Sequence, residues 1–139
     1  MSRFKSKKEL RLVMDQVIAT LGDDTEVGPR LRALGTPVEI TYTDFDLTVN
    51  IRGGEDGESN LVWVWSKRVK WEPATRIEVT SDVANQFMQG KLQVAKALAL
   101  RKAKVKGSLT AGLRIVAVCG PAFRHYRDRV ENDFPHLVV

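Results

Sequence analysis

The fold is decided by a stretch in the second half of the chain, where the spacing of apolar residues changes twice. Residues 76–107 read RIEVTSDVANQFMQGKLQVAKALALRKAKVKG. Strict alternation over residues 76–80 predicts a short strand. Ser81 and Asp82 offer helix-capping side chains, and apolar residues three and four apart then predict two short helices, over 82–89 and 93–101. Alternation returns at 103–105, so the chain makes a strand, two helices and another strand, a pattern typical of an α+β domain.

The sequence before this stretch predicts one long helix and three more strands. Residues 7–21 carry apolar side chains on one stripe with a period of 3.6 residues, which predicts an amphipathic helix. Alternation over 38–42 and 45–51, and the run LVWVW at 61–65, predict half-buried strands joined by turns or loops. Residues 29–35 leave room for one short turn.

The sequence after residue 107 is partly ambiguous. Residues 108–118 hold Leu109, Leu113 and Val116 in helical register, but the run from 115 to 119 reads equally well as a strand, and both interpretations stay open. Residues 121–132 carry an apolar stripe and predict a final helix. The apolar residues after it predict an exposed tail that docks on a partner.

Length and composition fit a single globular domain. The chain has 139 residues, of which 43% are apolar and 28% charged, close to globular averages of roughly 45% and 25%. We therefore predict one α+β domain over 1–139: a two-layer fold with a mainly antiparallel five-stranded sheet covered on one face by helices. It includes an N-terminal helix within 1–22 and a C-terminal helix and tail within 121–139. The pattern leaves open whether the layers meet tightly or enclose a cavity.

The charge is segregated along the chain. The net charge is +5, and residues 83–139 hold 10 basic and 3 acidic groups. Such a region attracts phosphate-bearing ligands, anionic membrane surfaces or nucleic acid. Nucleic acid is the weakest of these, because the lysines at 102, 104 and 106 have no interleaved aromatic residues for bases to stack on. A single cysteine, with neither a secretory signal nor a long apolar run, predicts a cytoplasmic protein.

No catalytic or metal-binding pattern is present. Two histidines and one cysteine match no short zinc-ligand spacing, and no glycine-rich loop has the lysine and serine or threonine of a phosphate-binding loop. A Cys119 and His125 pair is conceivable, but a small buried apolar residue and a surface histidine are the favoured interpretation. We expect a protein that is not an enzyme and has no cofactor or metal.

Four short runs resemble the sterol carrier protein type two family of lipid-binding domains. They are IEVTSD at 77–82, MQGK at 88–91, QVAKAL at 93–98 and AKVKGSL at 103–109. The resemblance implies a five-stranded, mainly antiparallel sheet and an apolar tunnel between sheet and helices for acyl chains, sterols or other lipids. Two departures are Ser108, where the family often has Asp or Asn, and the segment 121–139, which replaces a shorter tail.

The resemblance and the helical stripes together predict a binding site for a hydrophobic ligand. Apolar side chains on the helices would line it, although each could equally fill a solid core: Phe87, Met88, Leu92, Val94, Leu98, Leu113, Val116 and Phe123. Three basic side chains would hold a carboxylate or phosphate head at the mouth: Lys91, Lys96 and Arg101. The expected function is non-catalytic binding or transfer of a fatty acyl, sterol or other lipid. The alternative is an accessory domain that presents a lipid to a partner enzyme.

Overall fold

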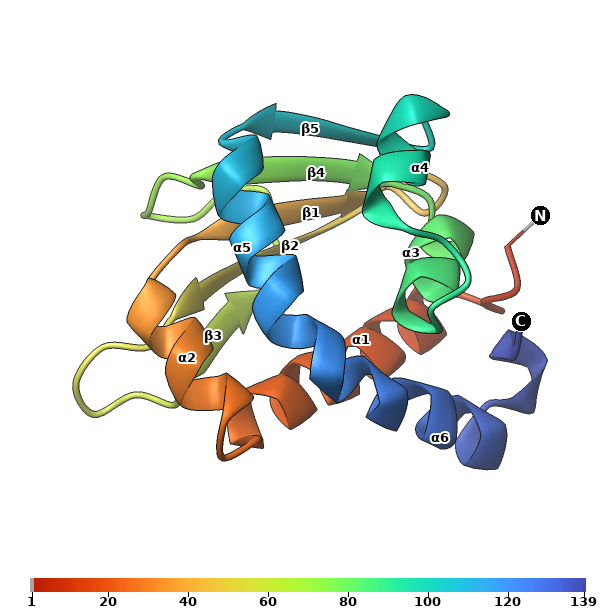
Figure 1. The fold of residues 1–139 in the computed structure, drawn as a ribbon, viewed down its shortest axis with the longest axis horizontal. Coiled ribbons are helices and arrows are strands. Elements are labelled where there is room, and N and C mark those ends of the chain that lie inside the picture. The colour runs from red at the N-terminus through yellow and green to blue at the C-terminus, as the bar shows by residue number, and fades with distance from the viewer. Residues whose placement is uncertain (1) are drawn as a thin grey trace.

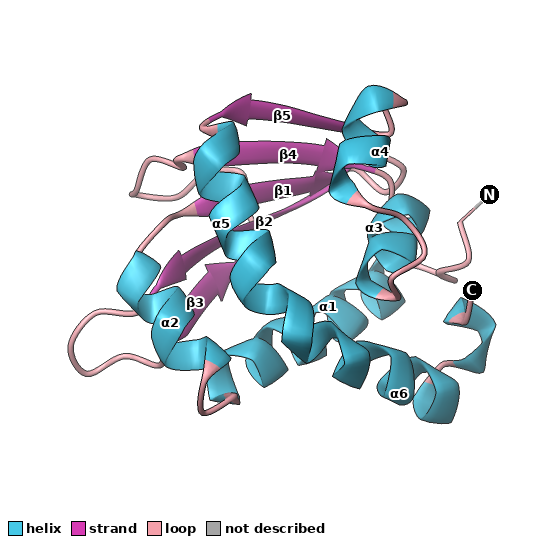
Figure 2. Ribbon diagram, in the orientation of Figure 1, coloured by secondary structure: helices cyan, strands magenta, loops and turns pink. Residues whose placement is uncertain are grey.

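The fold, seen in a computed structural model that describes residues 2–139, consists of one sheet and a layer of helices. Figure 1 shows the sheet behind, with α5 crossing in front of it and α1 and α6 running below, and Figure 2 separates the helices from the strands by colour. The predicted two-layer α+β architecture is confirmed. Elements from both halves of the sequence contribute to one buried apolar cluster.

The sheet has five strands in the order β3-β2-β1-β4-β5. Their bounds are β1 Val38–Tyr42, β2 Leu47–Gly53, β3 Leu61–Val64, β4 Thr75–Val79 and β5 Ala103–Gly107. Three of the four neighbouring pairs are antiparallel, which confirms the mainly antiparallel prediction, and β1 pairs with β4 in parallel. The parallel pair arises because residues 65–74 carry the chain from the β3 edge back across the sheet to the far side of β1.

The strand register gives the two faces of the sheet different chemistry. Ile40 lies opposite Val49 and Ile77, and Ile77 lies opposite Val105, so these side chains share the face that meets the helices. The other face carries polar and charged residues such as Glu39 and Lys104. Because β5 is an edge strand, its outward lysines protect an edge that would otherwise pair with other chains.

Six α-helices and two short 3-10 turns make up the second layer within residues 2–139. They are α1 Lys7–Asp23, α2 Val27–Leu34, α3 Ser81–Met88, α4 Val94–Ala99, α5 Leu109–Cys119 and α6 Phe123–Asp133, with η1 Gly120–Ala122 and η2 Pro135–Leu137. The stripe predicted for α1 is buried as expected. The ambiguous segment 108–118 is helical: Gly107, at φ +79°, turns the chain, and the Ser108 side chain accepts a hydrogen bond from the Ala111 amide.

Two local predictions are wrong. The segment expected to hold one turn is the eight-residue helix α2, which begins at Val27. The cap of α3 is Thr80, whose hydroxyl accepts from the Val83 amide. Ser81 was expected to help cap that helix but is buried, and it donates its hydroxyl to Asp44 at 2.6 Å.

The C-terminal tail, expected to be exposed, is packed against the protein. Leu137 is 0% exposed, and its carbonyl oxygen accepts hydrogen bonds from the side chains of Asn85 on α3 and Gln89 just after it. Arg127 on α6 donates to the carbonyl of Val139 at 2.7 Å. The tail packs over α3 and α6 because burying the Leu137 side chain there is more favourable than leaving its apolar surface in water.

Two tryptophans join the sheet to the long N-terminal helix. The indole N–H groups of Trp63 and Trp65 both donate to Oδ1 of Asp15, at 2.9 and 2.6 Å. Trp63 belongs to β3 and Trp65 follows it, while Asp15 lies in the middle of α1. The shared carboxylate fixes α1 beside the β3 edge and leaves the β4 and β5 side of the sheet to the other helices.

Candidate ligand-binding cavity

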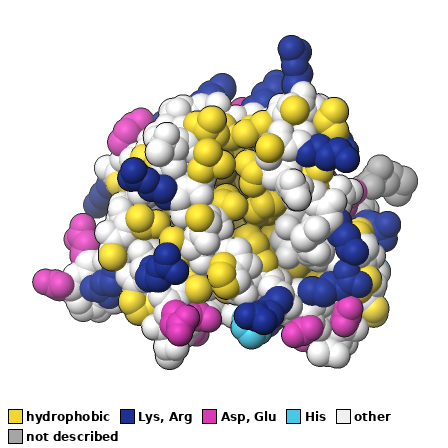
Figure 3. All heavy atoms as spheres, viewed as in Figure 1, with side chains coloured by type: hydrophobic (Ala, Val, Ile, Leu, Met, Phe, Trp, Pro, Cys, Tyr) yellow, Lys and Arg dark blue, Asp and Glu magenta, His cyan; other side chains and the backbone are white. Residues whose placement is uncertain are grey.

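The helices do not cover the sheet completely, and an apolar cavity of about 240 Å³ lies between the two layers. In Figure 1, α5 stands on one side of the uncovered region and α3 and α4 on the other. Figure 3 shows the same face in space-filling form, hollowed and lined with apolar side chains. Small-molecule sites commonly measure about 300 to 1,000 Å³, so this cavity is at the small end of that range.

The cavity floor is the middle of the sheet. Ile40 on the central strand β1 and Ile77 on the neighbouring strand β4 lie where helices normally cover a sheet, yet each is only partly buried. Helices α3 and α4 have eight and six residues, too short to span the sheet. The sequence left open whether the layers meet tightly or leave a cavity, and over this part of the sheet the structure leaves a cavity.

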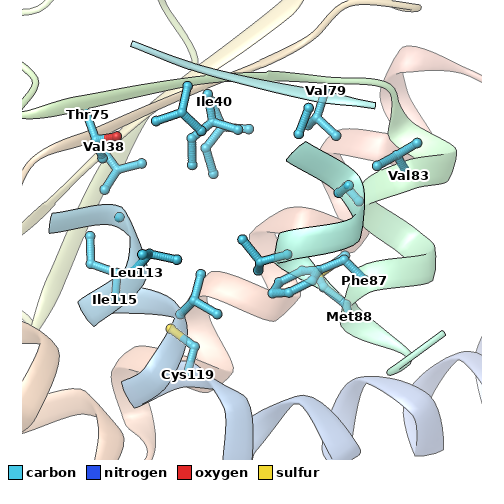
Figure 4. A pocket seen from close by; sticks show the side chains of 18 of the residues that line it. Val38, Ile40, Thr75, Val79, Val83, Phe87, Met88, Leu113, Ile115 and Cys119 are labelled. Carbon is cyan, nitrogen blue, oxygen red and sulfur yellow. The ribbon is translucent and has the colours of Figure 1, made fainter. Parts of the chain in front are cut away.

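Aromatic side chains form the lower wall. Phe87 on α3 and Phe123 at the start of α6 meet edge to face, with ring centroids 5.5 Å apart and an interplanar angle of 79°. This arrangement is favourable for two aromatic rings and fixes both of them. Figure 4 shows Phe87 and Met88 at this end of the cavity, with Val79 and Val83 above them. The rings therefore set the limit of the cavity toward α6.

The structure brings together most of the predicted apolar site residues. Seven of them line the cavity: Phe87, Met88, Val94, Leu98, Leu113, Val116 and Phe123. Leu92, in the connection between α3 and α4, is buried but does not line it. The basic residues Lys91, Lys96 and Arg101 are exposed and do not line it either.

Several lining residues were missed by the sequence analysis. They come from the strands, from α1 and from α5: Val38, Ile40, Ile77, Val105, Met14, Val17, Ile115 and Cys119. The strand residues carried a usable signal, because alternation had already placed them on one face of the sheet. Ile115 and Cys119 on α5 were missed because the run from 115 to 119 could not be assigned as helix or strand.

Nothing that lines the cavity is charged among residues 2–139, and only Tyr42, Thr75 and Cys119 bring a polar side-chain atom. Burial raises the pKa of the Cys119 thiol to about 11 and raises the pKa of the Tyr42 hydroxyl as well. Both groups are therefore protonated at neutral pH. The described residues hold no group of three His, Cys, Asp or Glu side chains placed to bind a metal. What the lining can do is bury apolar surface.

Among residues 2–139, no helix combines the length and the hydropathy that crossing a bilayer requires.

Comparison with known proteins rests on structure alone. No protein-family model matches the sequence, and no curated protein matches it. Among solved structures, the UbiJ-SCP2 ubiquinone synthesis protein superposes with a TM-score of 0.61 at 9% identity, over 81% of this chain and 89% of the other. Sterol Carrier Protein 2 from Yarrowia lipolytica superposes with a TM-score of 0.52 at 12% identity, over 81% of this chain and 95% of the other. This chain has the sterol carrier protein 2 fold.

The same fold occurs as a small part of a larger enzyme. The sec-alkylsulfatase Pisa1 from Pseudomonas sp. superposes with a TM-score of 0.54 at 12% identity, over 62% of this chain. This chain spans only 13% of the length of that protein. The sterol carrier protein 2 fold therefore forms nearly the whole of some solved chains and only a small segment of the much longer alkylsulfatase.

Proposed function

We propose that the protein binds a hydrophobic ligand without covalent chemistry, in the cavity between sheet and helices, and transfers it. The observation that carries this proposal is an open cavity of about 240 Å³ whose lining is uncharged. Apolar cavities of about 150 Å³ stay dry and take up small apolar molecules. Proteins with the same fold whose names include sterol carriers give the proposal independent support.

Affinity would come from the apolar surface that the ligand removes from water. Each buried methylene contributes roughly 0.8 kcal/mol, so two more methylenes raise affinity about tenfold. This gain stops when the cavity is full. A series of n-alcohols of increasing length should therefore bind more tightly with each methylene up to a definite length and then level off, as measured by displacement of the neutral fluorophore N-phenyl-1-naphthylamine.

The cavity assignment is tested by two tryptophan substitutions, one on α4 and one at the residue that caps its C-terminal end. Leu98 lines the cavity, whereas Leu100, two residues later, is 54% exposed and does not. Leu98→Trp should fill the cavity and abolish fluorophore uptake, while Leu100→Trp should leave it unchanged. Equal uptake by both folded variants would contradict the proposal.

Mass spectrometry of the purified protein under native conditions provides a direct complement. A small apolar molecule that travels with the protein and is released by organic extraction would support an occupied cavity. The Leu98→Trp protein, prepared in the same way, should carry none. If the wild-type protein and this variant carry the same molecule, it is bound elsewhere.

We further propose that the open side of the cavity meets an anionic bilayer. Leu109 and Leu113 line the cavity yet are each 45% exposed, and Leu100, which follows the last residue of α4, is exposed too. Residues 83–127, which include α4, β5 and α5 beside the opening, contain nine Lys or Arg and no Asp or Glu. In Figure 3, basic side chains border the hollow above and on the right. An apolar rim within a basic field suits an anionic lipid surface.

Membrane docking is tested by charge reversal at matched positions. Lys96 on α4 and Arg114 on α5 are exposed beside the opening, and Lys7 and Lys8 on α1 are equally exposed. A basic residue at an anionic surface contributes about 1 kcal/mol. The double variant Lys96→Glu and Arg114→Glu should lose at least tenfold in affinity for phosphatidylcholine vesicles containing phosphatidylglycerol. Lys7→Glu with Lys8→Glu changes the net charge equally and should lose much less.

A second candidate is an accessory domain that presents a lipid to a partner enzyme. The observation in its favour is the alkylsulfatase, in which this fold occupies a small part of an enzyme chain. The Phe134 to Val139 tail was the expected docking element, but its packing on α3 means that deleting it would disturb the fold. Addition of the protein to an enzyme acting on an insoluble alkyl substrate should raise the rate, and Leu98→Trp should remove the effect.

A further inference from the structure

The cavity wall contains a buried hydroxyl group that has no partner. Thr75, the first residue of β4, is 0% exposed and lines the cavity. Its Oγ1 makes no hydrogen bond in the structure. Figure 4 shows this oxygen beside Val38, at the end of the cavity opposite Phe87 and Met88. Buried hydroxyl groups in proteins are nearly always paired, so an orphan in a binding cavity calls for an explanation.

The helix that faces Thr75 leaves space at this hydroxyl. Gly112 on α5 lines the cavity, and a Cβ added to it would lie 3.5 Å from Thr75 Oγ1. Gly112 has an ordinary helical backbone, so no left-handed conformation requires glycine there. A glycine inside a helix is costly relative to alanine. Its presence at position 112 indicates that the space beside the Thr75 hydroxyl is kept free of a methyl group.

We infer that the Thr75 hydroxyl is the polar contact for the ligand, and that the ligand carries one neutral hydrogen-bonding group, a hydroxyl or a carbonyl, at that end. This inference rests on the proposed function and specifies the ligand class. A threonine hydroxyl both donates and accepts, so it pairs with either group. The ligand would then form a hydrogen bond with the Thr75 hydroxyl, which is unpaired in the empty protein. This hydrogen bond is more favourable than one that replaces a hydrogen bond to water.

The lining also argues against an ionised head group at this end. No Lys, Arg or His lines the cavity among residues 2–139, so a carboxylate or phosphate placed against Thr75 would have a single neutral donor. A charge buried without a counter-ion is far more costly than a buried hydroxyl. The ligand class is therefore a neutral lipid alcohol, ketone or ester, with the hydrocarbon extending from Thr75 toward Phe87.

The test uses three probes of equal chain length, 1-decanol, decane and decanoate, each competing with N-phenyl-1-naphthylamine. Thr75→Val replaces the hydroxyl by a methyl group of the same shape, and valine is favoured in strands. It should weaken 1-decanol about 3- to 10-fold and change decane by less than twofold. Gly112→Ala should weaken 1-decanol more than decane, because its methyl group occupies the space beside Oγ1. Decanoate should bind the wild type more weakly than 1-decanol.

A second readout does not depend on any ligand. Because Thr75→Val removes an unpaired buried hydroxyl, it should raise the Tm of the ligand-free protein, and circular dichroism should be unchanged. If Thr75→Val weakens 1-decanol and decane equally, or neither, the inference is wrong while the proposed function stands. Decanoate bound more tightly than 1-decanol would also overturn it. If the wild type takes up neither the fluorophore nor any probe, the proposed function falls and this inference with it.

Discussion

Asn85 on α3 donates a hydrogen bond of 2.8 Å to the carbonyl oxygen of Leu137, although 52 residues separate them, and both residues are fully buried. The Tyr126 hydroxyl on α6 donates to the Asn85 side-chain oxygen at 2.5 Å. The Asn85 side chain thus connects α3, α6 and the end of the chain. Because α3 also carries Phe87 and Met88, the tail supports one wall of the cavity.

Leu137→Ala should destabilise the protein by about 2 to 5 kcal/mol, the usual cost of truncating a fully buried leucine. Urea denaturation followed by circular dichroism measures this change. Leu12→Ala on α1 is the matched control, since Leu12 is 49% exposed, and it should change the free energy of unfolding by less than about 0.5 kcal/mol. Equal effects of the two substitutions would mean that the tail is not packed as described.

Asp15→Ala should destabilise the protein by about 1 to 3 kcal/mol, because the indole N–H groups of Trp63 and Trp65 both lose their acceptor. Asp15→Asn keeps one oxygen acceptor and should recover part of the loss. Asp23→Ala, at the exposed end of the same helix, serves as control and should have little effect. Tryptophan fluorescence reports the local change, and an unaltered spectrum in Asp15→Ala would count against the shared contact.

The Arg52 and Glu58 ion pair should make stability depend on pH in the acid range. The hydrogen bond from Arg52, at 2.9 Å, lowers the pKa of Glu58 from 4.5 to about 2, with help from the Glu55 amide. A carboxyl group with a lowered folded pKa contributes stability above its unfolded value and loses it as pH falls through the folded one. Glu58→Gln should therefore be less stable than wild type above pH 4.5. The two curves should converge between about pH 4.5 and 2, and parallel curves would contradict the assignment.

The sequence predicted the sheet well because the alternation of apolar and polar residues within each strand shows which side chains face the helices. Alternation at Ile40 and Ile77 depends only on neighbouring residues, and the resulting register places both on the cavity floor. The same local logic predicted the stripe of α1. These features need no knowledge of distant parts of the chain, so a single sequence suffices for them.

The cavity itself could not be predicted, because it depends on how far apart the helices stand. Seven of the predicted apolar residues line the cavity, but whether Leu98 and Leu113 touch is decided by helix length and by the position of α5. The tail was misjudged for a related reason. Leu137 looks like any terminal apolar residue in the sequence, and its burial depends on Asn85 and Tyr126, which lie far away along the chain.

Cys119 gives a chemical measure of how closed the cavity wall is. Burial raises the pKa of its thiol from 9.0 to about 11, and only the thiolate is nucleophilic. At pH 8 the folded protein should therefore react with iodoacetamide at least about 100-fold more slowly than the urea-unfolded chain. The rate should continue to rise tenfold per pH unit up to about pH 10, whereas the unfolded chain should level off near pH 9. A folded-state rate that levels off near pH 9 would mean that the wall opens and that the thiol reacts while it is exposed to water.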